Sequence, residues 1–305
     1  MAVTIIGTVA YDSITTPKGS RQKILGGSAV YAGIAANLFT DVHLISVVGE
    51  DFEPEHLDCF QSRCINIDGI HKSVGKTFAW KGSYEGDMNQ AYTHATELNV
   101  LCAFDPVIPY QARQSEIVFL ANIDPKLQKK ALKQFTNPKL VIADTMNYWI
   151  ENHLKDLKDT LELVDVLIIN DQEVKQLTGK GNVVQAIREA SKMGPKRVIV
   201  KKGEHGSMMY NSGNYFACPA HPVEDVVDPT GAGDSFAGGL AGYLDYAGTF
   251  SEDMFKESII VGTLVSFHTL QGFGLETLFK ITKNNIREKY SSLYNFTALP
   301  RELSF

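Results

Sequence analysis

The stretch DPTGAGDSFAGGL, from Asp228 to Leu240, carries the strongest structural signal in the chain. Its first half is a turn rich in glycine around Gly231 and Gly233, and its second half has the apolar spacing of a helix. A turn that opens directly into a helix presents main-chain N–H groups, and the helix dipole adds positive charge at the same point. The stretch therefore predicts an anion-binding site, built of main chain, at the start of a helix.

Asp234 lies in the first turn of that predicted helix. A carboxylate at this position is stabilised as a helix cap, and it could equally accept a hydroxyl proton while the neighbouring amides stabilise a transferring phosphoryl group. The spacing alone leaves both interpretations open.

The same helix contains an unusual number of small residues, among them Gly238, Gly239 and Gly242. Glycine inside a helix costs about 1 kcal/mol relative to alanine. Their accumulation predicts that a backbone or a ligand approaches this helix closely.

Short runs rich in Val, Ile and Leu alternate with segments of helical periodicity along most of the chain. The predicted strands are Thr4–Val9, Val42–Val48, Ile117–Ala121, Leu140–Ala143, Val164–Ile169 and Arg197–Lys201. The predicted helices are Ser28–Phe39, Lys126–Phe135, Asn147–Leu161, Val183–Met193, Gly231–Tyr246, Glu252–Leu270 and Leu275–Ser291. This alternation predicts an α/β fold, a three-layer α/β/α sandwich whose mostly parallel central sheet is covered on both faces.

Polar side chains follow the predicted strands where ligands bind in such sheets, outside the carboxyl ends. They are Asp12, Asn122, Asp144, Asn170, Lys201 and Lys202. Each one alone is better explained as a turn former or helix cap, but their number favours a site at this edge.

The segment from Lys76 to Leu101 has a different pattern, a partial alternation of apolar and polar residues that is typical of antiparallel strands. Together with Ser13–Lys23 it predicts a small sheet that acts as a discontinuous lid on a single domain of residues 1–305. Its aromatic side chains would either stack on a base or form the core of the sheet; they are Phe78, Trp80, Tyr84 and Tyr92. The exposed edge of such a sheet is also a plausible dimer surface.

Composition excludes several classes of function. The chain has 29 basic and 35 acidic residues, a net charge of −6, which argues against bulk attraction to nucleic acid or an anionic membrane. No apolar run is long enough for a membrane span, the start lacks a signal-peptide pattern, and the four cysteines form no CxxC pair. We therefore expect a cytoplasmic enzyme without a metal site built from cysteine.

Four segments together resemble the PfkB, or ribokinase-like, family of carbohydrate and nucleoside kinases. DPTGAGDSFAGGL resembles its carboxyl-terminal signature, GGSAVYAGIAANLF at 26–39 its amino-terminal glycine pair, NDQE at 170–173 its NxxE motif, and VIVKKGEHGSMM at 198–209 its nucleotide-side strand and turn. GGSAVY, TELNVL and DTMNYW are most similar to an uncharacterised branch of sugar kinases in that family.

The resemblance implies roles for individual residues on the phosphate side. Asp234 would be the base, with the amides of Gly231, Ala232 and Gly233 as the anion hole. The implied ATP and Mg²⁺ contacts, with Glu173 reaching the metal through water, are Asn170, Glu173, Lys201, Lys202, Gly203, Gly206 and Thr230. Asp228, Thr230 and carbonyls of the loop 271–274 would hold a monovalent cation, K⁺.

On the acceptor side the resemblance implies Asp12 as the group that accepts sugar hydroxyls, with Gly26 and Gly27 letting the backbone approach; Asn122 is a further candidate. Relatives that bind ribose commonly carry lysine and asparagine after the glycine pair, where this chain has Ser28 and Tyr31. The acceptor thus stays open between a sugar and a nucleoside.

We predict an ATP-dependent kinase that phosphorylates a primary hydroxyl of a sugar. The first alternative is a nucleoside kinase, for example one acting on adenosine. An alternative of another class is a non-catalytic ligand-binding or regulatory protein on the same fold. Retention of the GAGD and NxxE patterns argues against the last, because binding alone needs no base beside an anion hole.

Overall fold

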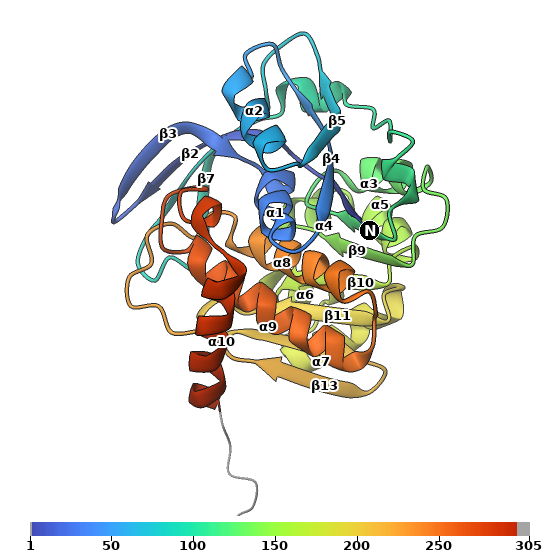
Figure 1. The fold of residues 1–305 in the computed structure, drawn as a ribbon. Helices are drawn as coiled ribbons and strands as arrows, with labels where there is room; N and C mark the ends of the chain where they lie inside the picture. Colours follow the sequence, from blue (N-terminus) through green and yellow to red (C-terminus); the bar gives the residue numbers. More distant parts are fainter. Residues whose placement is uncertain (1, 298–305) are drawn as a thin grey trace, which may run out of the picture.

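The computed structural model describes residues 2–297 and contains two β-sheets (Figure 1). The larger has nine strands in the order β13-β12-β11-β10-β9-β8-β1-β4-β5. Its strands are β1 (Ala2–Ile6), β4 (Asp41–Val48), β5 (Asn66–Lys72), β8 (Ile117–Leu120), β9 (Leu140–Asp144), β10 (Val166–Asn170), β11 (Arg197–Lys201), β12 (Ser207–Asn211) and β13 (Asn214–Cys218). Neighbours from β5 to β11 pair in parallel, whereas β12 and β13 add an antiparallel edge. The predicted mostly parallel sheet is confirmed.

Helices cover both faces of this sheet, because its central strands are apolar on both sides. Val3 and Ile5 pack in one core cluster with Val30, Leu240 and Leu264, whereas Ile6 packs on the other face with Ala131. The helices are α1 (Ser28–Asn37), α2 (Pro54–Ser62), α3 (Pro125–Leu132), α4 (Asn147–Asn152), α5 (Leu154–Leu161), α6 (Asp171–Thr178), α7 (Val183–Ala190), α8 (Ala232–Ala247), α9 (Glu252–Thr269) and α10 (Lys283–Thr297). The α/β/α sandwich is thus confirmed.

Two helix predictions were wrong in their bounds. The predicted helix 147–161 is two helices, α4 and α5, because His153 leaves helical geometry with φ −134° and ψ 31°. The predicted helix 275–291 starts only at Lys283, after a short 3₁₀ turn at Leu278–Lys280. The hydroxyl of Thr282 accepts the N–H of Asn285 at 3.3 Å, which fits a helix start at this point.

The close approach predicted from the small residues of α8 is confirmed. A Cβ atom on Gly238 would lie 2.1 Å from the carbonyl oxygen of Ala32, and one on Gly242 would lie 2.6 Å from that of Ala36. Both oxygens belong to the main chain of α1, which lies beside α8 in Figure 1. Glycine is needed at these positions because the two backbones touch there.

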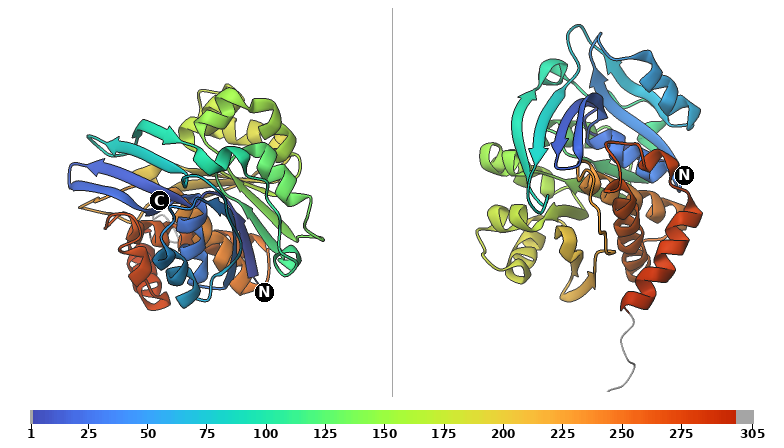
Figure 2. Two further views of the ribbon diagram at one scale, coloured as in Figure 1. Left: turned by 90° about the horizontal axis from the view of Figure 1, so that it is seen from above. Right: turned by 90° about the vertical axis from the view of Figure 1, so that its left-hand side faces the viewer.

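The smaller sheet has the order β3-β2-β6-β7, from β2 (Ala10–Thr16), β3 (Gly19–Gly26), β6 (Ala79–Tyr84) and β7 (Ala91–Glu97). We call it the small sheet. Parallel pairing of β2 with β6 joins its two halves side by side, although α1, β4, α2 and β5 lie between them in the chain (Figure 2). The threonine hydroxyl of Thr16 and the ammonium of Lys18 reach across to the loop before α8, to the carbonyl of Val227 at 2.9 Å and to Asp225 at 2.6 Å.

Within residues 2–297, no helix combines the length and the apolar character that crossing a membrane requires.

The contact between α1 and α8 predicts the effect of one added methyl group. Gly238→Ala should lower the free energy of unfolding by about 2 kcal/mol, because the rigid carbonyl of Ala32 cannot yield and the overpacking outweighs the gain in helix propensity. Gly239→Ala in the same helix is the matched control, since its Cβ would meet the side chain of Val265 at 3.0 Å, which can adjust. Equal stability of the two variants in urea unfolding would contradict this account.

Candidate active site

Polar side chains from three neighbouring strands meet at the carboxyl edge of the large sheet. Asp144 ends β9, Asn170 ends β10 and Lys201 ends β11. Asn170 pairs in register with Lys201, and Ile168 of β10 pairs with Asp144. The amino end of α8 lies at the same edge, because a Cβ on Gly233 would come within 2.9 Å of the Lys201 Nζ.

The turn before α8 has the geometry that its glycines allow. Gly231 is the N-cap with φ 73° and ψ 1°, a left-handed conformation that glycine adopts without strain. Its carbonyl accepts the N–H of Ser235 at 2.8 Å, and the N–H of Ala232 donates to the Pro229 carbonyl at 3.2 Å. Asp234 follows in the first helical turn. The turn therefore places a carboxylate next to an amide-rich helix terminus.

Lys201 and Asp144 form a buried ion pair behind that turn. The Lys201 Nζ lies 2.8 Å from the Asp144 Oδ2, with side-chain exposures of 19% and 5%. Attraction to Asp144 and Glu173 outweighs burial, so the pKa of Lys201 is raised and the ammonium stays charged at neutral pH. One cation is thus shared by several carboxylates.

Asp234 and Glu173, the two other carboxylates near this cation, hold their protons more tightly than usual. Burial raises the pKa of Asp234 to about 7, with the charge of Asp144 adding to the effect and Lys201 opposing it. Burial and Asp144 likewise raise the pKa of Glu173 to about 7. A carboxylate with a pKa near neutrality is well matched to accepting a proton at that pH.

Asn170 and Glu173 form a capping box at the start of α6. The Asn170 Oδ1 accepts the N–H of Glu173 at 2.8 Å, and the Glu173 Oε2 accepts the N–H of Asn170 at 2.9 Å. The cap fixes both side chains at the sheet edge. The predicted NxxE pair therefore has a structural role that holds it beside the site.

On the opposite side of the α8 turn, Asp12 lies in β2 of the small sheet and is buried. A Cβ on Gly26 would lie 1.9 Å from the Asp12 Oδ2, and Gly27 has φ 99° with its amide donating to the Asp12 carboxylate. Burial raises the pKa of Asp12 to about 7, with Asp228 and Asp234 adding to the effect. Glycine is thus required at position 26 by the Asp12 carboxylate. At position 27 it is required by the positive φ and by the Thr8 carbonyl oxygen, which would lie 2.4 Å from a Cβ.

Ser28 and Asn122 contact each other and are largely engaged within the protein. The Ser28 Oγ donates to the carbonyl of Asn122 at 2.9 Å and accepts the N–H of Thr8 at 3.1 Å. The Asn122 Oδ1 accepts the indole N–H of Trp149 at 2.8 Å. Both predicted acceptor-side residues lie near the site, but their polar atoms already have partners.

Tyr31 and the small-sheet residue Tyr84 flank the α8 turn. A Cβ on Gly231 would come within 2.3 Å of the Tyr31 ring, so the ring lies against the turn. The hydroxyl of Thr230 donates to the Tyr84 hydroxyl at 3.4 Å. The small sheet is thereby linked to the turn before α8.

Asp228 ties two loops together rather than pointing freely into the site. Its Oδ1 accepts the N–H of Thr230 and its Oδ2 accepts the N–H of Gly274, each at 2.9 Å. The carbonyl oxygens of the loop 271–274 are the other groups predicted to hold a monovalent cation.

Lys202, Gly203 and Gly206 form the tight connection from β11 to β12. The N–H of Lys202 donates to the Gly206 carbonyl at 2.8 Å, and the two glycines have φ of 55° and 77°. Asn89 of the small-sheet connection donates to Glu204 in this turn at 3.3 Å. The turn lies at the end of the strand that carries Lys201.

The sequence analysis assigned no role to Asp144 or Tyr84, which contact Lys201 and Thr230 in the structure. Asp144 was only one of several polar residues after a strand, and its partner Lys201 is far away in the chain. Tyr84 was one of four aromatics in the predicted lid. The strand-end rule was the available signal for Asp144, whereas nothing in the sequence singled out Tyr84.

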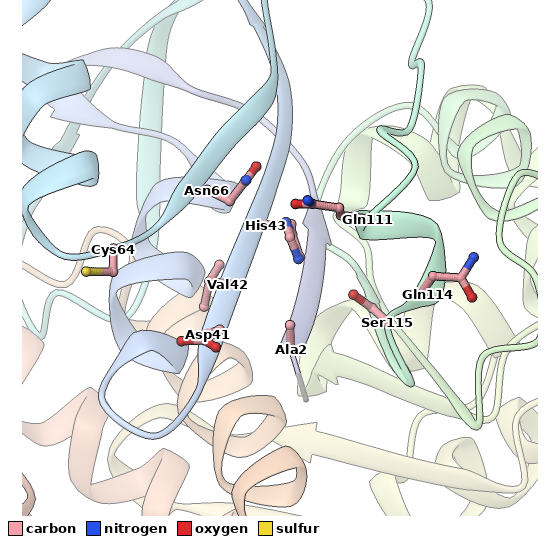
Figure 3. A pocket seen from close by; sticks show the side chains of 9 residues that line it. All are labelled: Ala2, Asp41, Val42, His43, Cys64, Asn66, Gln111, Gln114 and Ser115. Atoms are coloured by element: carbon pink, nitrogen blue, oxygen red, sulfur yellow. The ribbon is translucent and has the colours of Figure 1, made fainter.

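A separate polar depression of about 530 Å³ opens at the amino edge of the sheet, away from these groups (Figure 3). The hydroxyl of Ser115 in its wall is already hydrogen-bonded to Thr4 at 2.8 Å, and the Asn66 amide to Asp68 at 3.0 Å. Gln111 and Gln114, which lie on the same side as Ser115 in Figure 3, are exposed. The carboxyl edge, with its convergent charges, is the candidate active site.

Comparisons with known proteins support a common origin over nearly the whole chain. The model of the pfkB family of carbohydrate kinases matches residues 3–277. A cytidine kinase from Thermococcus kodakarensis is 31% identical over 247 residues, which are 78% of this chain and 87% of that protein. A nucleoside kinase from Methanocaldococcus jannaschii is 27% identical over 237 residues, 74% of each chain.

Solved structures share the fold. The crystal structure of the Methanocaldococcus jannaschii nucleoside kinase superposes with a TM-score of 0.76 at 20% identity, covering 95% of this chain and 98% of that one. The nucleoside kinase of Burkholderia thailandensis in complex with inosine gives 0.79 at 19% identity, covering 96% and 99%.

The raised pKa of Asp12 predicts how stability changes with pH. The folded protein binds a proton at Asp12 that the unfolded chain releases near pH 4, so the stabilisation is present at low pH and is lost as the pH rises through about 7. Asp12→Asn removes the cost of a buried charge and should be more stable than the parent at pH 8 by at least about 1 kcal/mol. Thermal unfolding at pH 5 should show a much smaller difference; the same difference at both pH values would contradict the prediction.

The buried ion pair predicts non-additive stability. Lys201→Met leaves Asp144 buried without its cation and should cost about 3 kcal/mol of unfolding free energy, part of which Asp144→Asn in the same chain should restore. The exposed pair of Lys139 and Glu116, at 2.7 Å, is the control, and removing Lys139 should cost under about 1 kcal/mol. Additive losses in the double variant by urea unfolding would show that the pair is not coupled.

Proposed function

The chain belongs to the pfkB family of carbohydrate kinases, and on that premise we propose that it transfers the γ-phosphoryl group of ATP to the primary hydroxyl of a nucleoside. At the level of the family it is a sugar or nucleoside kinase, an ATP-dependent phosphotransferase with a hydroxyl group as acceptor.

The relatives favour the nucleoside over the sugar that the sequence alone placed first. Besides the cytidine kinase, the nucleoside kinase of Methanothermobacter thermautotrophicus is 28% identical over 75% of the chain. A free sugar is the second candidate, because a ribokinase from Lactococcus lactis is 24% identical over 90% of the chain.

The observation that carries the proposed chemistry is the position of Asp234 beside the Gly231 turn and Lys201. In this proposal the carboxylate of Asp234 accepts the proton of the acceptor hydroxyl as its oxygen bonds to phosphorus. The amides of Gly231 and Gly233 and the ammonium of Lys201 stabilise the negative charge of the transferring group. The amide of Ala232 would join them by exchanging its hydrogen bond to the Pro229 carbonyl for one to the phosphoryl group. Burial of the site keeps these interactions strong because little water screens them.

The residues present fit Mg²⁺ and the phosphates of ATP. Mg²⁺ bound with ATP is held mainly by phosphates and one or two carboxylates, and Glu173 offers a carboxylate at this edge of the sheet. Glu173, through water, and the neighbouring Asn170 are the proposed protein contacts, and bound Mg²⁺ would neutralise charge on the phosphates. The β11–β12 turn, from Lys201 to Gly206, is proposed to face the nucleotide.

On the acceptor side, Asp12 is proposed to accept hydrogen bonds from two neighbouring hydroxyls, which a ribose offers. The small sheet then acts as a lid, since it carries both Asp12 and Tyr84 and bonds to Thr230. Exclusion of water by this lid would limit hydrolysis of ATP.

Two further proposals concern K⁺ and assembly. Both carboxylate oxygens of Asp228 already accept main-chain N–H groups, so K⁺ would depend on carbonyl oxygens of the loop 271–274 together with Thr230. The edge strand β7 is exposed along its whole length, and pairing of two such edges is the proposed route to a homodimer.

The test is ADP release from ATP and Mg²⁺ with a panel of acceptors: cytidine, adenosine, inosine, aminoimidazole riboside, ribose and fructose. We expect the highest kcat/KM with a nucleoside. Asp234→Asn should lower kcat by a factor of about 10² or more with little change in ATP binding, because the base is lost while the fold and the amides remain.

Tyr243→Phe, a change on the same helix away from the turn, serves as the control and should keep the parental rate. A preference for free ribose or fructose would overturn the nucleoside assignment. Full turnover by the Asp234→Asn variant would remove the base from that residue, and stimulation by no acceptor would favour a ligand-binding protein.

A further inference from the structure

The depression at the amino edge of the large sheet (Figure 3) contains polar side chains that the proposed kinase reaction does not use. Thr4 of β1, His43 of β4 and Asn66 of β5 pair in register, so their side chains lie on one face of the sheet. Two positions further along, on the same face, the paired residues Ile6 and Ile45 are apolar and pack in the core. A polar row across three neighbouring strands is thus confined to the start of these strands.

The members of this row differ in whether they have partners. The Thr4 hydroxyl bonds to the Ser115 hydroxyl at 2.8 Å and donates to the Ala112 carbonyl at 3.1 Å. The Nδ1 atom of His43 is shielded from solvent and has no hydrogen-bond partner among residues 2–297. Leaving a buried ring nitrogen unpaired costs folding free energy. A half-turn about the Cβ–Cγ bond carries this nitrogen to the other edge of the ring, so His43 can offer it to a molecule in the depression that the ring lines.

Carboxamide groups lie around the imidazole. In Figure 3 the side chains of Asn66 and Gln111 come from opposite sides of His43, and the Gln111 carboxamide is directed toward it. The carboxamide of Gln114, at the end of the 3₁₀ turn that follows Gln111, is directed away from His43. The Asn66 amide bonds to Asp68, whereas both glutamines are exposed. A carboxamide carries a donor and an acceptor side by side, so Gln111 can pair at two points with a planar ligand edge that carries the complementary groups.

The charge of the depression disfavours the phosphate-bearing ligands of the candidate active site. Among the lining residues that the structure describes there is no lysine or arginine, whereas Asp41 is acidic. Phosphate groups favour cationic partners and are repelled by carboxylates. The cavity volume of about 530 Å³ lies within the range of small-molecule sites, roughly 300–1,000 Å³. An uncharged, planar molecule with hydrogen-bonding edges therefore fits this depression.

We propose that the depression binds a nucleobase, free or as part of a nucleoside, at a site separate from the candidate active site. The Gln111 carboxamide pairs with a donor–acceptor edge of the base, and the His43 imidazole contacts the same ring system. The depression lies at the start of β1, β4 and β5, whereas the candidate active site lies at the carboxyl ends of β9, β10 and β11. The proposal goes beyond the proposed function and does not depend on phosphoryl transfer, because a free base has no primary hydroxyl.

Calorimetric titration of the full chain with free cytosine, adenine and uracil, without ATP, tests this proposal. We expect at least one base to bind. Gln111→Ala should weaken that binding by about 10-fold, because a two-point hydrogen-bonded pair is lost. Gln114→Ala is the matched control, since its carboxamide is directed away from His43, and it should change the affinity by less than about twofold.

Nuclear magnetic resonance tests the histidine in the unaltered chain. Saturating base should shift the imidazole nitrogen resonances of His43, which are assigned by their absence from the spectrum of His43→Asn. His221 is the control, because it lies in the loop before α8, where its Nε2 is 3.3 Å from the Ser292 hydroxyl, and its resonances should stay unchanged. A purely structural His43 would show no shift.

Titration with cytidine and adenosine distinguishes the two sources of the base. A His43 shift with the nucleoside as well as the base identifies a nucleoside as the ligand, and a shift with the base alone identifies the free base. The proposal is overturned if no base binds at millimolar concentration, or if a base binds with Gln111→Ala as tightly as with the parent and leaves His43 unshifted. Binding of ribose that Gln111→Ala weakens, without binding of a base, would also overturn it by assigning the depression to a polyol. Phosphorylation of a nucleoside by the parent stands or falls separately from these results.

Discussion

The close contact between α1 and α8 is the constraint on which the site depends. Two glycines of α8 lie against main-chain carbonyls of α1, at Ala32 and Ala36, so the helix axes approach more closely than side chains would allow. This contact aligns the two helix starts, with Gly27 before α1 and Gly231 before α8. Tyr31 fills the space between them. The glycine pair near Asp12 and the turn that precedes Asp234 are neighbours for this reason.

The second organising feature is the balance of charge at the carboxyl edge. Asp144, Glu173 and Asp234 lie within electrostatic range of one ammonium, that of Lys201, and burial disfavours the charged forms of Glu173 and Asp234. Burial, with the charge of Asp144 adding to it and Lys201 opposing it only in part, raises the pKa values of Asp234 and Glu173 to about 7. In the proposed enzyme, ATP with Mg²⁺ would enter a region whose charge is already partly neutralised, and Asp234 would change protonation state near neutral pH.

The small sheet covers the candidate site and also carries polar side chains that face it. Its strands β2 and β6 carry Asp12 and Tyr84, and the hydroxyl of Thr230 joins it to the turn before α8. Any movement of this sheet would therefore carry the proposed acceptor contacts with it. Such coupling between cover and contact is how a kinase of this kind would bind its acceptor before excluding water.

The sequence by itself determined the fold class, most of the strands and the motif residues, because hydrophobic periodicity and turn chemistry are local properties. It predicted β11 with its observed bounds and the need for glycine on α8. It misplaced the start of α10 and merged α4 with α5, since breaks such as that at His153 depend on packing that periodicity does not register.

Only the tertiary structure decided which of the predicted residues act together. The pairing of Lys201 with Asp144, the engagement of the Ser28 hydroxyl by Asn122 and Thr8, and the unpaired hydroxyl of Tyr31 all join or separate groups that are distant in the chain. Burial, which raises the pKa of Asp12 and of Asp234, likewise arises only when the small sheet and α8 meet. Sequence motifs thus identify which residue types a site contains. The distances between these residues and their burial, which exist only in the folded chain, determine which side chains pair and which carboxyl groups are protonated.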